Sequence, residues 1–271
     1  IGREDETEVI SMQVCKVRIA EEDDIDFLAG CGHSENDIEI LESIGRKREF
    51  FRKRWKVGLV SLIGLVEGNR AGFLNMFPIE ISPWGPFGED LYVIPCLFVI
   101  WDHQRRELGK AMMSAAIEMA SKTSRKGIVA FAFSEPDWFL PEGFFKRFGF
   151  AEISSNGDEK LLLLKFSNDV KTPVQFVSRY VYHKVPGKVV VDLFYNTFCS
   201  TSDIEAQRVK EVAAEFGESV VLRSHEIDDE GARERFSLPR GIFVNGREIF
   251  WGYEAPREGI REAILRELNQ L

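Results

Sequence analysis

The hydrophobic pattern of the first part of the chain predicts a mixed sheet with flanking helices. Short apolar runs of strand length, separated by turn residues, come mostly in succession and only later alternate with helical spacing. We expect strands over residues 15–19, 59–66, 71–79, 90–100, 128–133 and 160–166, and helices from about residue 25, from about residue 35 and over 108–121. Ser34 and Asp37 form a capping-box pattern for the second helix. This order is typical of an α+β fold.

The last part of the chain repeats the strand and helix patterns on a smaller scale. The expected order is a strand over 189–195, a helix over 202–216, a strand over 220–226, a short helix near 230–236, a hairpin of strands 242–244 and 248–250, and a helix from Pro256. Asn245 and Gly246 form the two-residue turn that is typical of a β-hairpin. The pattern therefore predicts a second, smaller α/β unit.

Turn residues gather between these two parts and indicate a boundary. Pro173, Pro186 and Gly187 interrupt a stretch in which only residues 174–182 have the pattern of a short strand. At roughly 100–200 residues per domain, 271 residues are enough for two domains. We expect a tail over 1–11, a first domain over 12–167, a linker over 168–187 and a second domain over 188–271.

Composition and charge narrow the class of protein. The chain is 44% hydrophobic and 29% charged, which is typical of a folded globular protein. Its net charge of −9 disfavours nucleic acid as a partner, because that binding needs clustered cations. No apolar run approaches the about 20 residues that span a membrane. The four cysteines lack CxxC spacing, so we expect reduced thiols, no metal site and a cytoplasmic protein.

The stretch from Pro95 to Met113 has the most informative pattern in the chain. A buried strand ends in a polar turn, and the turn leads directly into a helix. The first N–H groups of a helix lack intrahelical partners and lie at the positive end of its dipole. Arg105, Arg106 and Lys110 add positive charge there. This arrangement favours a phosphate or pyrophosphate ligand.

Here the chain resembles the GNAT superfamily of acetyl-CoA-dependent N-acetyltransferases. Leu97-Phe98-Val99 matches the end of the family's strand, and its Gln/Arg-x-x-Gly-x-Gly/Ala loop falls on Gln104, Glu107 and Gly109, with glutamate in place of the first glycine. A second register, Arg106-x-x-Gly109-x-Ala111, fits the loop literally but shifts the helix by two residues. The resemblance implies an acetyl-CoA site formed by Leu97, Phe98, Val99, Gln104, Arg105, Arg106, Glu107, Leu108, Gly109, Lys110, Ala111 and Phe145.

The segment from Phe144 to Phe150 strengthens this resemblance, because it is similar to the family's Phe-Tyr-x-x-x-Gly-Phe signature. The family reaction is direct attack of a neutral amine on the thioester, which implies a backbone N–H near 97–99 that polarises the carbonyl. Phe145 stands where the family's tyrosine acid would be and cannot donate a proton. The candidate bases, which spacing does not rank, are Glu80, Glu89, Asp90 and His103.

The second unit resembles the thioredoxin/glutaredoxin-like fold, shortened at its N-terminal end. Cys199 begins the segment that matches Cys-x-x-Cys, with Ser202 in place of the second cysteine, and Pro239 matches the cis-proline before the hairpin. A thiol at a helix N-terminus is expected to have a lowered pKa. The loss of the second cysteine leaves two interpretations, a single reactive thiol or a relic in a domain kept for binding.

Two further features have a structural interpretation and a functional alternative. Residues 46–56 carry seven cations among aromatic residues, which favours the solvated face of an amphipathic helix over a phosphate or partner contact. The triplet Cys31-Gly32-His33 favours an ordinary loop over a reactive thiol or half a metal site, because no further ligands follow at suitable spacing.

The sequence therefore predicts a two-domain acetyltransferase that acts on a small amine or peptide amine with acetyl-CoA. Two alternatives remain open at this point. One is a thiol-dependent oxidoreductase or mixed-disulfide protein that acts through Cys199. The other is a binding module without catalysis, as the residues Glu107, Phe145 and Ser202 together suggest.

Overall fold

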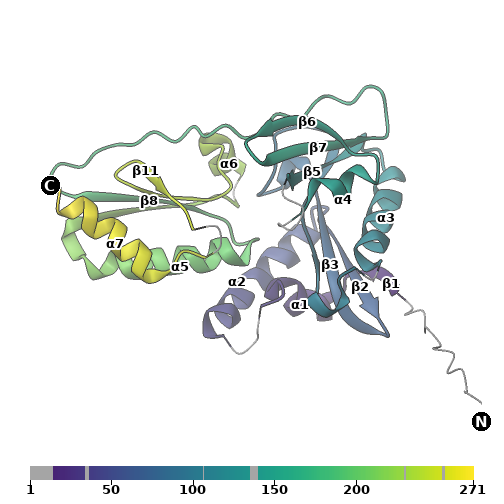
Figure 1. Ribbon diagram of the computed structural model, residues 1–271, viewed down its shortest axis with the longest axis horizontal. Coiled ribbons are helices and arrows are strands. Elements are labelled where there is room, and N and C mark those ends of the chain that lie inside the picture. The colour runs from purple at the N-terminus through teal and green to yellow at the C-terminus, as the bar shows by residue number, and fades with distance from the viewer. Residues whose placement is uncertain (1–14, 34–36, 106, 135–139, 229, 252–253) are drawn as a thin grey trace, which may run out of the picture.

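The computed structural model describes residues 15–33, 37–105, 107–134, 140–228, 230–251 and 254–271, and these residues form two sheets (Figure 1). The first sheet has the order β1-β2-β3-β4-β5-β7-β6, and the second has the order β11-β10-β8-β9. The strands are β1 (Cys15–Ile19), β2 (Val60–Val66), β3 (Asn69–Pro78), β4 (Leu91–Val99), β5 (Gly127–Phe133), β6 (Ala151–Asn156), β7 (Glu159–Lys165), β8 (Val189–Tyr195), β9 (Val220–Glu226), β10 (Gly241–Val244) and β11 (Arg247–Ile249).

Helices pack on both faces of the first sheet. They are α1 (Ile25–Gly30), α2 (Ile38–Trp55), α3 (Leu108–Ser121) and α4 (Glu142–Lys146), with short 3-10 turns η1 (Glu22–Asp24), η2 (Ile79–Ile81) and η3 (Trp101–His103). Alternation along β3 shows the two layers, since Leu74 and Met76 pack towards α3 whereas Phe73 and Phe77 pack towards α1 and α2. Only β4 and β5 pair in parallel, so the sheet is mixed.

The second sheet has its own core. Strand β9 pairs with β8 in parallel, while β10 pairs with β8 in antiparallel fashion. Helices α5 (Ser200–Glu215) and α7 (Arg257–Leu268) pack on this sheet, and α6 (Glu230–Phe236) and the turn η4 (Gly217–Ser219) complete the unit. An extended connection runs from β7 to β8 (Figure 1). No helix in the described part of the chain is long and apolar enough to cross a membrane.

Most predicted elements are confirmed, and three local expectations are wrong. Helix α2 begins at Ile38 rather than near residue 35, because the Asp37 carboxylate accepts a hydrogen bond from the N–H of Glu39 and caps the helix there. Ser34 lies outside the described residues. Helical spacing predicts that Leu41 shares one face with Ile44 and Phe51, which are buried, but Leu41 is 48% exposed. The segment 174–182 forms no strand, and only its first residue pairs, in an isolated bridge between Val174 and Phe87.

The cations of α2 depart in part from the predicted solvated face, because Arg46, Lys47 and Arg54 contact the second unit. Arg46 forms an ion pair of 2.9 Å with the buried carboxylate of Asp203. Lys47 is 2% exposed and donates a hydrogen bond to Ser200. Solvated ion pairs within the first unit account for others, such as Arg48 with Asp26. The predicted solvated face is therefore confirmed for part of the run, as in Arg48, Arg52 and Lys53, while the rest forms a junction with the second unit.

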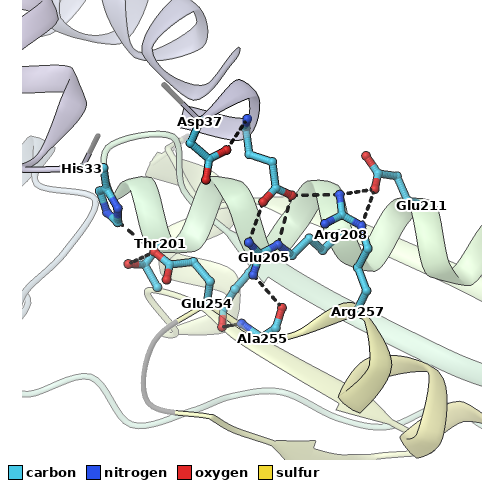
Figure 2. Close-up of polar contacts among 10 residues, drawn as sticks. His33, Asp37, Thr201, Glu205, Arg208, Glu211, Glu254, Ala255 and Arg257 are labelled. Atoms are coloured by element: carbon cyan, nitrogen blue, oxygen red, sulfur yellow. Dashed lines mark hydrogen bonds and ion pairs between the residues drawn. The ribbon is translucent and has the colours of Figure 1, made fainter. Parts of the chain in front are cut away.

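The same junction continues along α5. Arg208 donates to both carboxylate oxygens of Glu39, at 3.0 and 2.6 Å, and Arg257 also pairs with Glu39 at 2.8 Å. Figure 2 shows Arg208 and Arg257 beside Glu211, close to the start of α2. Phe198 packs edge-on against Phe77 with ring centroids 5.0 Å apart, which extends the core of the first unit into the second.

Candidate functional site

The parallel pairing of β4 with β5 stops halfway along β4. The last paired residues are Ile94 and Ala130, although β4 continues to Val99 and β5 to Phe133. Beyond Ile94, the only strand paired with β4 in the described part of the chain is β3. Backbone groups that the last residues of β4 direct towards β5 therefore have no partner on that strand, and they are available to an extended ligand.

A β-bulge in β4 lies at the point where this pairing ends. Cys96 pairs with Asn75 and Val93 pairs with Phe77, so that three steps along β4 match two along β3. The extra residue changes which side chains face each layer. After the bulge, Leu97 packs on the α3 face, whereas Cys96 packs on the face of α1 and α2.

The turn after β4 leads into α3 as the sequence predicts. Gln104 donates from Nε2 to the carbonyl of Val99 at 3.1 Å, which ties the turn to the end of the strand. Arg105 and Glu107 both have left-handed backbone, with φ of 60° and 65°. The first N–H of the helix to bond within it is that of Ala111, which donates to the carbonyl of Glu107. The N–H groups at 108–110 therefore point out of the helix start.

Glu107 and Lys110 pair with each other at this helix start. Lys110 donates to both carboxylate oxygens of Glu107, at 2.7 and 2.8 Å, and the Glu107 side chain is 70% exposed. Glu107 makes no side-chain cap bond to the helix. Glu107, which stands where the family has its first glycine, thus has a solvent-exposed carboxylate that partly neutralises the charge of Lys110. Arg106 lies outside the described residues.

Helix α4 meets the start of α3 at the free end of β4. A methyl group at Gly109 would lie 3.7 Å from the ring of Phe144 and 3.9 Å from Leu97. Leu140, just before α4, accepts a hydrogen bond from the N–H of Phe133 at the end of β5. The two segments that the sequence singled out, the loop after β4 and the aromatic segment of α4, therefore lie together at the unpaired ends of β4 and β5.

Phe145 is part of the core. It is fully buried and packs edge-on against Phe144 and Phe150, with ring centroids 5.4 Å apart in each pair. Phe144 rather than Phe145 is the α4 ring that approaches Gly109.

Three of the four candidate bases lie at the other end of β4. Glu80 follows β3, and Glu89 and Asp90 precede β4, so all three are separated from the α3 turn by the length of the strand. Each is engaged in an ion pair, Glu80 with Arg125 at 2.9 Å, Glu89 with Lys171 and Asp90 with Lys126 at 3.5 Å.

His103 is the candidate base at the end of β4 that leads into α3. It ends the turn η3, which directly follows β4. Its Nδ1 is buried and has no hydrogen-bond partner among the described residues. An unpartnered buried ring nitrogen is costly unless a ligand or water satisfies it. The structure therefore distinguishes His103 from the three carboxylates, which spacing alone did not.

Cys199 corrects the expectation of a lowered thiol pKa. It precedes α5, as predicted, and its N–H donates to the side chain of Asn196 at 2.9 Å. Burial raises the pKa of the Cys199 thiol, and this outweighs the nearby guanidinium of Arg240. The peptide bond before Pro239 is trans, whereas the resemblance implied cis. Ser202 has a hydroxyl in place of the second thiol, and this hydroxyl accepts a hydrogen bond from the N–H of Asn196.

The sequence did not predict that three of the cysteines and a buried lysine lie close together. Cys31, Cys96 and Lys47 lie around the same buried cluster as Cys199. They belong to a loop, a strand and a helix that are far apart along the chain, and no motif spans them. The triplet Cys31-Gly32-His33 and the run of cations that contains Lys47 are separate features of the sequence, and neither one indicates a shared cluster.

Comparison with known proteins gives structural similarity only. No family model matches the chain, and no curated protein matches it in sequence. Similar solved structures include a GNAT-family acetyltransferase from Streptococcus pneumoniae, with a TM-score of 0.44 and 14% identity, covering 57% of this chain and 100% of that one.

Two others are described as complexes. An N-acetyltransferase from Thermoplasma acidophilum with coenzyme A has a TM-score of 0.40 and 13% identity, covering 56% of this chain and 99% of that one. A GNAT-family acetyltransferase from Brucella melitensis with acetyl-CoA has a TM-score of 0.40 and 15% identity, covering 59% of this chain and 94% of that one.

Proposed function

We propose that the first unit transfers an acetyl group from acetyl-CoA to the amine of a small molecule or peptide. The observation that carries this proposal is the end of β4–β5 pairing at Ile94, followed directly by the turn into α3. An unpaired strand edge suits the extended, amide-containing arm of the cofactor, and a helix start suits its pyrophosphate. The GNAT resemblance of both flanking segments supports the same assignment.

The residues present fit this cofactor. The N–H groups at 108–110 and the ammonium of Lys110 would hold the pyrophosphate, and Gly109 leaves the approach to them open. Leu97 and Phe144 supply an apolar surface beside that glycine. Arg105 adds a further cation in the turn. Glu107 opposes binding by its charge, but its ion pair with Lys110 keeps it at the exposed side of the helix start.

Bound there, the cofactor supplies an activated acetyl thioester. The chain's own contribution is orientation of the acceptor and polarisation of the carbonyl by a backbone N–H within 97–99. His103 is our choice among the four candidates for removing the ammonium proton of the amine. Because Phe145 is buried and cannot donate a proton, the departing thiolate would take its proton from solvent.

We also propose that the second unit is a thioredoxin-like domain and that the boundaries are those predicted, with a linker over 168–187. Its order β11-β10-β8-β9, with β8 and β9 parallel and β10 antiparallel, supports this assignment. The raised pKa of Cys199 counts against a reactive thiol at that position. The second unit then acts as an accessory domain docked on α2.

Incubation of the full chain with acetyl-CoA and a panel of primary amines and peptides tests the activity, with acetylated products detected by mass spectrometry. The expected result is an acetylated amine that requires the protein. Replacement of His103 by Gln should lower the rate at least ten-fold and shift the pH dependence, while Glu89→Gln should not. Cofactor binding without any product across the panel would overturn the proposal in favour of a binding module.

A further inference from the structure

Three of the four cysteines converge at the junction of the two units. Cys31 directly follows α1, Cys96 lies on β4 just after the bulge, and Cys199 precedes α5. All three belong to or contact the same hydrophobic cluster. Cys96 is 8% exposed, while Cys31 and Cys199 are partly exposed. Cys15 packs on the opposite face of the sheet and belongs to another cluster. The convergence is therefore selective and not a consequence of cysteine content.

Cys31 and Cys96 are in direct contact, because the Cys96 thiol donates a hydrogen bond to the sulfur of Cys31. The backbone holds Cys31 in this position. Cys31 itself has a left-handed conformation with φ of 50°, and Gly32 follows with φ of 80°. A methyl group at Gly32 would lie 2.3 Å from the ring of Phe98, so the turn packs directly against β4. Two sulfurs are thus held together by segments 65 positions apart (96 − 31).

A buried cation lies beside this pair. Lys47 donates from Nζ to Oγ of Ser200 at 2.8 Å, and that hydroxyl donates to the carbonyl of Ala29 at 3.1 Å. Lys47 acts electrostatically on all three thiols. It has no carboxylate partner among the described residues, which leaves its charge available to a thiolate.

The other groups that face Cys31 are His33, Glu254 and Cys199. Figure 2 shows His33 directed towards Glu254, 3.7 Å away, and Glu254 also accepts a hydrogen bond from Thr201. The hydrogen bond from Cys96 lowers the pKa of Cys31, burial opposes it, and Lys47 and His33 lower it further, while Glu254 raises it. The same contact raises the pKa of Cys96. These opposite directions favour Cys31 over Cys96 as the sulfur that loses its proton first.

We propose that Cys31 and Cys96 form a redox-active dithiol that exchanges with small-molecule disulfides, with Cys31 as the attacking thiolate and Cys96 as the resolving thiol. This goes beyond acetyl transfer and does not depend on it. It also places the thiol chemistry on a pair contributed by the first unit, instead of on Cys199.

The exchange balances in two steps. The Cys31 thiolate attacks a disulfide RS–SR, forming a Cys31–SR mixed disulfide and releasing RS⁻. Cys96 then loses its proton to solvent and attacks the Cys31 sulfur, forming the Cys31–Cys96 disulfide and releasing the second RS⁻. The protein pair is oxidised by two electrons, and the disulfide is reduced to two thiols after each RS⁻ takes a proton from solvent. Lys47 is a positioning residue, which stabilises the attacking thiolate.

The test uses the full reduced chain and oxidised glutathione at pH 7, with acid quenching, alkylation of the remaining thiols and peptide mapping by mass spectrometry. The expected product is a Cys31–Cys96 disulfide, with Cys15 and Cys199 left free. Cys96→Ser should stop the reaction at a glutathione adduct on Cys31, and Cys31→Ser should abolish it. Cys15→Ser is the matched control and should leave it unchanged.

Two results would overturn the proposal. One is a disulfide or adduct found mainly on Cys199 or Cys15. The other is alkylation of Cys31 that is no faster, at pH 7, than that of Cys15 in the same chain. The pH profile of Cys31 alkylation supplies a readout that a structural role would not move, since its midpoint should lie below the value of about 8.5 for a free thiol. Lys47→Gln should move that midpoint upwards, whereas Lys53→Gln on the exposed face of α2 should not.

Discussion

The buried ammonium of Lys47 donates a hydrogen bond of 2.8 Å to the hydroxyl of Ser200, which joins α2 of the first unit to the first turn of α5. This contact carries a charge across a junction from which water is largely excluded. Replacement of Ser200 by Ala should therefore leave the ammonium without its acceptor. A hydrogen bond to a charged group contributes about 1.5–3 kcal/mol.

We expect Ser200→Ala to lower the free energy of unfolding by about 2 kcal/mol, measured by urea denaturation of the full chain. Ser114→Ala is the control, because Ser114 lies exposed in a comparable helix and its removal should change stability by less than about 0.5 kcal/mol. Equal effects of the two substitutions would show that the junction does not depend on this bond.

The carboxylate of Asp24 provides a second prediction about stability. It is fully buried and accepts hydrogen bonds from Arg18 at 3.0 Å and from Arg70 at 2.6 Å. Burial raises the pKa of Asp24, but the hydrogen bonds from Arg18, the Glu21 N–H and Arg70 together lower it well below its usual range. Its contribution to stability is therefore present above about pH 4 and lost as the pH falls.

Asp24→Asn should cost about 2–3 kcal/mol at pH 7, because it leaves two guanidinium groups facing a neutral amide. The difference from the wild-type chain should shrink as the pH falls towards 3. Asp23→Asn changes the neighbouring, exposed carboxylate and should have little effect at either pH. Thermal unfolding at pH 7 and pH 3 measures both, and a deficit that does not depend on pH would contradict the assignment.

Asp228 predicts the opposite pH dependence. Burial raises the pKa of this carboxyl to about 6, even though the Thr197 N–H and hydroxyl donate to it. The folded chain then binds more protons than the unfolded chain between about pH 4 and pH 6, so the contribution of Asp228 to stability is present below that range and lost as the pH rises through it.

Asp228→Asn should accordingly raise the melting temperature by a few degrees at pH 7.5 and by much less at pH 4.5. The expected gain is about 1–2 kcal/mol, reduced from the full shift because the side chain is partly exposed. Differential scanning calorimetry at the two pH values measures it. A variant that is destabilised equally at both would show that Asp228 is needed in its charged form.

Glu107 predicts the effect of charge at the proposed cofactor site. Glu107→Gln removes an anion and releases Lys110 from its ion pair, while no side-chain cap bond is lost. We expect the dissociation constant for coenzyme A to fall about two- to five-fold, as suits one exposed charge near a pyrophosphate. Glu118→Gln is the matched control at the far end of the same helix, where Glu118 pairs with Lys122. Weaker binding by Glu107→Gln would indicate that the carboxylate contacts the ligand.

Much of the fold follows from the sequence because local signals agree there. The sequence predicts a helix over residues 108–121, which are the bounds of α3, and β8 and β9 also have the predicted bounds. The turn at Asn245-Gly246 joins β10 to β11 because Asn245 and Gly246 both have positive φ, which this residue pair tolerates. Helix α2 began three residues later than expected because Asp37 caps it with its side chain.

The features that the sequence did not predict depend on contacts between distant segments. In the sequence, Lys47 is one of seven cations within residues 46–56, and nothing local distinguishes it from the others. It is buried because the second unit, with Ser200, packs against it. Cys31 and Cys96 have no common motif, because a turn and a strand bring them together through packing against Phe98. The bulge before Cys96 depends on the register in which β3 pairs with β4, and the pattern of residues along the chain does not determine that register.

Binding of acetyl-CoA to the full chain, measured by isothermal titration calorimetry, tests the central claim most directly. Lys110→Gln and Lys122→Gln form a matched pair, since each removes an exposed lysine that pairs with a nearby glutamate, one at the start of α3 and one at its end. We predict saturable binding with one site, weakened at least three-fold by Lys110→Gln and unchanged by Lys122→Gln. No binding, or equal binding by both variants, would contradict a cofactor site at the start of α3.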